Sequence, residues 1–94
     1  MLPRGINVKV LNRLVEDMKK SGLIAERHSY SIRIMYRNRI VASIHLYPGY
    51  DNAVVKLYGD EEANRVVLET TVELLKKHLP GFKVEFQVIT HQFK

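Results

Sequence analysis

The stretch that decides the fold runs from Tyr30 to Tyr50 and reads YSIRIMYRNRIVASIHLYPGY. Apolar and polar residues alternate along most of it, and a period of two is typical of strands in a half-buried sheet. The residues that we expect to face the core are Tyr30, Ile32, Ile34, Tyr36, Ile40, Ala42, Ile44 and Leu46. The stretch therefore predicts two antiparallel strands that share one apolar face.

A three-residue loop at residues 37–39, which read RNR, is expected to join the two strands. This loop pairs Ile34 with Ala42, so that apolar side chains meet, whereas a two-residue turn would pair Ile34 with Val41 and mix the faces. Asn38 suits the loop because asparagine tolerates a left-handed backbone better than most residues. The predicted register places Val41 on the face opposite to the core.

Beyond Tyr50 we expect a third strand, a helix and a last strand. Residues 48–52 (PGYDN) form a turn, and AVVKLY at 53–58 alternates again. Asp60 is the expected N-cap of the helix, and the proline and glycine at 80–81 end it. The apolar residues of this helix are Ala63, Val67, Leu68, Val72, Leu74, Leu75 and Leu79. The last strand, FKVEFQVI at 82–89, is expected to bury Phe82, Val84, Phe86 and Val88.

Upstream of the stretch, residues 7–20 carry apolar side chains at spacings of three and four, which predicts an amphipathic helix. Asn7 is its expected N-cap, and Gly22 is placed to end it. The segment LIAERH at 23–28 is either a short strand or an extended connection.

These segments predict an α+β fold with two layers. The antiparallel sheet contains a three-stranded meander, the C-terminal strand and, if LIAERH is a strand, a short extra one. Both helices cover one face of the sheet, because each apolar face must be buried against another element. The other face stays partly open. Residues 1–94 form a single domain, since a chain of this length supports one hydrophobic core.

Composition narrows the classes of function. The chain has no cysteine, which excludes disulfides and thiolate zinc sites, and no apolar run approaches the roughly 20 residues of a membrane helix. A cytoplasmic location is therefore expected. The net charge is +5, and the excess is N-terminal: nine Lys/Arg stand against three acids through Tyr50, and six against seven beyond it. Such a positive region attracts polyanions.

The open face of the predicted sheet is basic and aromatic. It comprises Ser31, Arg33, Met35, Arg37, Arg39, Val41, Ser43, His45, Tyr47, Val54, Lys56 and Tyr58. Cations neutralise phosphates, and aromatic rings stack on unpaired bases, so this mixture favours single-stranded DNA or RNA as the partner. We expect phosphates at Arg33, Arg37, Arg39 and Lys56, bases on Tyr47 and Tyr58, and supporting contacts from His45 and Tyr50.

The sequence bears on two other classes of function. Apolar residues such as Met35 and Val54 on the same face suit a homodimer or an interface with another protein. Catalysis, for example by a hydrolase, is disfavoured, because the chain has no phosphate-binding glycine motif and no nucleophile with a base nearby in sequence. The four histidines lack the short spacing of a metal site. We therefore expect neither a cofactor nor a metal.

The order of elements resembles two families of nucleic-acid-binding proteins. A helix, a three-stranded meander and a second helix are similar to the double-stranded-RNA-binding domain, but GDEEANR stands where that family has lysines that grip phosphate. Residues 7–79 are also similar in element order to the archaeal single-stranded-DNA-binding proteins of the ThermoDBP type. The second resemblance implies an antiparallel sheet with a basic, aromatic cleft, and it assigns no site residue.

Overall fold

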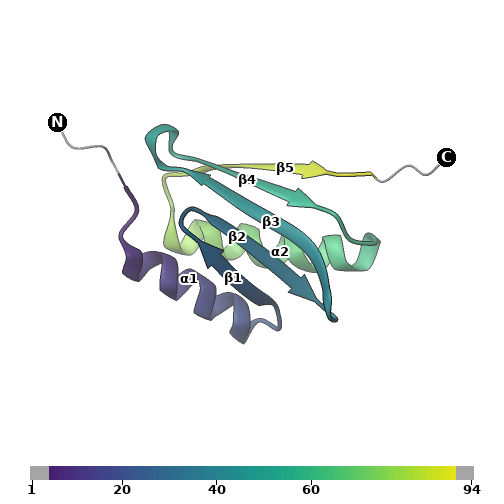
Figure 1. Cartoon of the computed structure of the whole chain (residues 1–94). Coiled ribbons are helices and arrows are strands. Elements are labelled where there is room, and N and C mark those ends of the chain that lie inside the picture. The colour runs from purple at the N-terminus through teal and green to yellow at the C-terminus, as the bar shows by residue number, and fades with distance from the viewer. Residues whose placement is uncertain (1–4, 91–94) are drawn as a thin grey trace.

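Five strands form one sheet, and two helices lie against one of its faces in the computed structural model, which describes residues 5–90 (Figure 1). The elements in chain order are α1 (Val8–Lys20), β1 (Ile24–His28), β2 (Ser31–Tyr36), β3 (Arg39–Tyr47), the 3₁₀ turn η1 (Pro48–Tyr50), β4 (Asn52–Leu57), α2 (Glu61–His78) and β5 (Lys83–Val88). The predicted α+β class with two layers is confirmed. The segment that the sequence left open, LIAERH, contains the edge strand β1.

The strands follow one another across the sheet in the order β1-β2-β3-β4-β5. The first four form an antiparallel meander, whereas β5 runs parallel to β4. This orientation follows from the connection, because α2 carries the chain back along the sheet before β5 begins. The expectation of a wholly antiparallel sheet is therefore wrong at its last strand. No helix in residues 5–90 is both long enough and apolar enough to cross a membrane.

Both predicted helix starts are capped as expected. The Asn7 side chain accepts a hydrogen bond from the Lys9 amide at 2.8 Å, and Asp60 Oδ1 accepts one from the Ala63 amide at 2.8 Å. These bonds satisfy amides that have no partner within the helix. At the end of α1, Gly22 adopts a φ of 93°, a left-handed conformation that glycine supplies at little cost.

The core lies between the helices and one face of the sheet. Its largest fully buried side chains are Leu11, Leu14, Met18, Leu23, Ile32, Ile34, Ile44, Val55, Leu57, Val67, Thr71 and Leu75. Thr71 is the polar residue among them, and its hydroxyl donates to the carbonyl of Val67 at 2.7 Å. Leu68 and Val88, which were expected to be buried, are 39% and 65% exposed. Val88 lies on β5, the strand at one edge of the sheet.

The β2–β3 hairpin departs from the predicted loop. Its turn has two residues, Arg37 and Asn38, with positive φ angles of 52° and 64°, as in the type I′ turn that matches strand twist. Ile34 still pairs with Ala42 as predicted, but Met35 pairs with Ile40, so β3 has one extra residue. A bulge at Val41 thus reconciles the tight turn with the apolar register.

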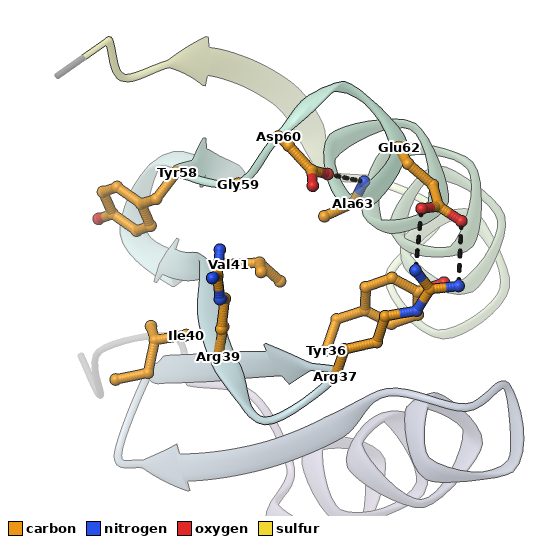
Figure 2. A pocket seen from close by; sticks show the side chains of 10 residues that line it. All are labelled: Tyr36, Arg37, Arg39, Ile40, Val41, Tyr58, Gly59, Asp60, Glu62 and Ala63. Carbon is orange, nitrogen blue, oxygen red and sulfur yellow. Dashed lines mark hydrogen bonds and ion pairs between the residues drawn. The ribbon is translucent and has the colours of Figure 1, made fainter.

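This bulge exchanges two side chains between the faces. Val41, predicted on the open face, is only 3% exposed, and Ile40, predicted in the core, is 53% exposed. The two side chains lie on opposite sides of the strand (Figure 2). Gly59 borders the buried side, where a Cβ atom on it would come within 3.2 Å of the Val41 Cβ and 2.8 Å of the Ala63 Cβ.

Candidate nucleic-acid interface

The face of the sheet opposite to the helices carries polar rows that run across the strands. Paired residues on neighbouring strands share a face, so the pairing register defines each row. One row is Glu26, Arg33, Ser43, Lys56 and Gln87. The next is His28, Ser31, His45, Val54 and Glu85. We call this surface the open face.

A hydrogen-bonded chain crosses the centre of the open face. The Ser31 hydroxyl lies 3.3 Å from His45 Nδ1, and the Ser43 hydroxyl lies 3.0 Å from His45 Nε2. Ser43 also lies 3.0 Å from the Tyr58 hydroxyl. Both ring nitrogens of His45 are thus held by hydroxyl groups, which fixes the orientation of the ring.

The surroundings of His45 favour its uncharged form. Partial burial lowers the pKa of His45 below its usual 6.5, and the positive charge of Lys56 lowers it further. His45 is therefore uncharged at neutral pH. It donates or accepts hydrogen bonds on this face and adds no positive charge to it.

Arg33 and Lys56 supply the positive charge at the centre of the open face. Arg33 lies 3.7 Å from the Glu26 carboxylate, and both side chains are about half exposed. Lys56 forms no ion pair with another residue of 5–90. Strands lie about 4.8 Å apart, so the backbone positions of Arg33 on β2 and Lys56 on β4 are roughly 10 Å apart, with Ser43 between them.

Lys83 is a further cation of this face that sequence reasoning missed. Lys83 is exposed and pairs with Asn52 of β4. Asn52 in turn pairs with Tyr47 of β3, so the three residues lie in one row. The alternation of FKVEFQVI already places Lys83 opposite to the apolar residues of its strand. Its position beside Asn52, however, depends on the parallel register of β5.

Two predicted phosphate ligands, Arg37 and Arg39, do not belong to the open face. Arg37 points toward α2, and its two terminal nitrogens lie 3.1 and 3.2 Å from the two carboxylate oxygens of Glu62 (Figure 2). Arg39 pairs with Tyr36. Arg37 and Arg39 both line a pocket of about 450 Å³ beside the start of α2 (Figure 2). For Arg39 the cause is the bulge at Val41, which reverses the faces of residues 39–41 relative to the predicted register, whereas Arg37 lies in the tight turn itself.

The three predicted tyrosines lie at different places. Tyr58 follows β4 and lines a shallow groove of about 750 Å³ on the open face, together with Arg33, Ile40, Ser43, His45 and Lys56 among others. Tyr47 is exposed at the far end of β3. Tyr50, in η1 beyond that end, is 84% exposed. The groove therefore contains one tyrosine, and two more stand at the end of the sheet.

An apolar row borders the groove at the end nearer to the β2–β3 turn, away from Tyr47 and Tyr50. Ile24 pairs with Met35, and Met35 pairs with Ile40, so the three side chains lie side by side on the open face. Ile24 and Ile40 are each about half exposed. Of the apolar residues expected here, Val54 lies on the face but is largely buried, and Val41 does not lie on it.

Within residues 5–90, no three His, Asp or Glu side chains gather closely enough to hold a metal ion. Neither the protein-family models nor the curated protein sequences give a match to the chain.

Proposed function

We propose that this protein binds single-stranded DNA or RNA on its open face. The observation that carries the proposal is the groove in which Tyr58, Arg33 and Lys56 surround the fixed Ser43–His45 pair, on a sheet face that neither helix covers. Phosphates are held by Arg33, Lys56 and Lys83. Such a role fits the cytoplasmic location expected of this chain without cysteine.

The groove combines the two elements that recognition of single strands needs. Guanidinium and ammonium groups neutralise phosphates with release of counterions, and an aromatic ring accepts a stacked base of any sequence. The Ser31, Ser43 and His45 side chains add donors and acceptors at the height of the sheet surface, where the edge of a stacked base lies. Tyr47 and Tyr50 extend the stacking surface beyond the ends of β3 and β4.

Dependence of binding on salt tests the phosphate contacts. Each contact on a single strand contributes about 0.7 to the slope of log affinity against log salt, so three cations give a slope of about 2. Arg33→Ala and Lys56→Ala should each lower this slope by about 0.7. Lys76→Ala removes the same charge from the exposed surface of α2 and should leave the slope unchanged.

Fluorescence anisotropy with single- and double-stranded oligonucleotides, at two salt concentrations, makes these measurements. Equal slopes for the Arg33→Ala, Lys56→Ala and Lys76→Ala variants would contradict phosphate binding by Arg33 and Lys56 on the open face.

A pair of substitutions at Tyr58 tests stacking separately. Tyr58→Leu removes the ring and should weaken binding by about 1–3 kcal/mol, the usual contribution of one stacked base. Tyr58→Phe keeps the ring and loses only the hydroxyl that contacts Ser43 at 3.0 Å, so affinity should stay close to that of the unmodified protein. Equal affinities of the Leu and Phe variants would contradict a stacking role.

A second candidate function is association with a protein through the same face. The exposed apolar row of Ile24, Met35 and Ile40 favours it, since adjacent apolar side chains in contact with water mark interfaces. Met35→Glu would place a charge in the middle of this row. Loss of a measured complex in this variant, with no binding of any oligonucleotide to the unmodified protein, would favour this candidate.

A further inference from the structure

β5 is the last strand of the sheet, and no other strand of residues 5–90 pairs with its outer edge. The amides of Lys83 and Ile89 donate to the carbonyls of Asp51 and Leu57 at 2.8 Å each. In a parallel ladder alternate residues bond to the same neighbour, so the odd-numbered residues of β5 face β4. Val84, Phe86 and Val88 therefore direct their N–H and C=O groups outward.

The side chains along this edge are apolar on the helix side. Val84 and Phe86 are half-buried, and Val88 is 65% exposed. Leu68, 39% exposed on α2, belongs to the same region. Lys77 marks the flank of α2 that faces α1, because its ammonium group lies 3.1 Å from the Asp17 carboxylate. Leu68 precedes Lys77 by nine residues in the same helix. At 3.6 residues per turn this is about two and a half turns, so Leu68 lies on the flank of α2 away from α1, under β5.

The opposite edge of the sheet is different. β1 is a five-residue strand with the sequence IAERH, and three of its residues are Glu26, Arg27 and His28. Short strands with charged side chains are a common protection against unwanted pairing. On β5 the three residues with outward amides are all apolar, whereas the amides of its charged residues, Lys83 and Glu85, face β4, so the outer edge suits a partner strand.

We propose that a second copy of this chain pairs with the outer edge of β5. The two β5 strands run antiparallel about a twofold axis perpendicular to the sheet, and they form one continuous sheet with twice the five strands of a single copy. In this arrangement the helices of both copies lie on one side, and the two open faces adjoin on the other. The inference does not rest on nucleic-acid binding.

Hydrogen bonding and charge select one register for the pair. Hydrogen bonds across the new edge form only if residues with outward amides on one copy lie opposite residues with outward amides on the other. If Phe86 lies opposite Phe86 of the second copy, Val84 lies opposite Val88. This register uses all three outward residues and places Glu85 opposite Gln87. The next register, with Val84 opposite Phe86, would place Glu85 opposite itself, and directly opposed like charges destabilise strand pairs.

Sedimentation equilibrium over a range of concentrations tests the association. The unmodified protein should be dimeric at high concentration, and Val88→Lys should raise the dissociation constant about 100-fold, because the charge enters twice per dimer at about tenfold, or 1.4 kcal/mol, each. Ile24→Lys is the matched control: it places the same charge at an exposed apolar site on the open face near the other edge, and it should leave the dimer intact. Circular dichroism verifies that both variants fold.

Three outcomes overturn the proposal. One is a monomer at every concentration. Another is a dimer that persists in Val88→Lys. The third is a dimer that is lost in the control Ile24→Lys, which would place association on the open face.

Disulfide cross-linking tests the register independently of Val88. The chain has no cysteine, so single-cysteine variants are specific probes. Glu85→Cys and Gln87→Cys replace exposed residues. In the proposed register an equimolar mixture of the two variants should form a covalent dimer, whereas each variant alone should not, because like positions then lie more than about 7 Å apart. Cross-linking of Glu85→Cys alone, or no cross-linking of the mixture, would contradict the register.

Discussion

The guanidinium of Arg37, in the β2–β3 turn, is paired with the carboxylate of Glu62 in the first turn of α2, through contacts of 3.1 and 3.2 Å. Arg37 also lies over the ring of Tyr36, 5.2 Å from its centroid. These contacts join the hairpin to the helix layer. They also direct the positive charge of Arg37 away from the open face, although the sequence alone suggested a phosphate ligand.

Arg37→Ala should therefore have little effect on nucleic-acid binding. We expect the salt slope to stay unchanged, in contrast to Arg33→Ala. The free energy of unfolding should fall by only about 0.2–1 kcal/mol, since both partners of the pair are substantially exposed. Anisotropy and urea unfolding measure the two quantities. A slope reduced as much as in Arg33→Ala would show that Arg37 contacts phosphate after all.

His45 should make stability depend on pH near neutrality. Its pKa in the folded protein is lowered, so on acidification through 6.5 the unfolded chain takes up this proton first. The free energy of unfolding should therefore decrease as the pH is lowered through 6.5. It should show no further decrease from His45 once the pH is below the folded-state pKa. His45→Gln should remove this part of the dependence, as measured by urea unfolding between pH 7.5 and 5.

The two causes of the His45 shift can be separated by NMR titration. Lys56→Gln removes the neighbouring positive charge and should raise the pKa of His45, though not fully to 6.5, because burial is the larger cause. A pKa that does not change in this variant would refute the contribution of Lys56.

Asp17 should stabilise the contact between the two helices in a pH-dependent way. Hydrogen bonds from His78 at 2.7 Å and Lys77 at 3.1 Å lower the pKa of Asp17 below its usual 3.8. The stabilisation is then fully present above 3.8 and is lost as the pH falls through the folded-state value. Asp17→Asn should destabilise the protein at pH 6, and this difference should shrink below pH 3.8. The same difference at both pH values would contradict this assignment.

Gly59 should tolerate no larger side chain. A Cβ atom there would lie 2.8 Å from the Ala63 Cβ and 3.2 Å from the Val41 Cβ, which forces α2 and the bulge apart. We expect Gly59→Ala to cost about 1–3 kcal/mol, the usual effect of overpacking. Gly81→Ala is the matched control, because a Cβ at Gly81 meets no atom within 4 Å. Thermal unfolding of both variants should show a clear loss only in the first.

The pattern in the sequence was sufficient for most of the architecture. Alternation identified the strands and the pairing of Ile34 with Ala42, and the caps at Asn7 and Asp60 identified both helix starts. These features depend on residues near one another in the chain. The predicted positions of the candidate side chains were less accurate: Arg33, His45, Tyr47, Lys56 and Tyr58 lie on the open face, whereas Arg37 and Arg39 do not.

Local sequence pattern is enough to set which face of each regular strand is apolar, because the side-chain period of a strand is fixed at two. Only the tertiary structure decided how the hairpin meets α2. There a tight turn, the apolar register and the close approach of Val41 to Gly59 must all be satisfied together, and the bulge is the solution. The parallel direction of β5, the position of Lys83 and the free edge at Val88 follow likewise from the path of α2 across the sheet, which no local pattern specifies.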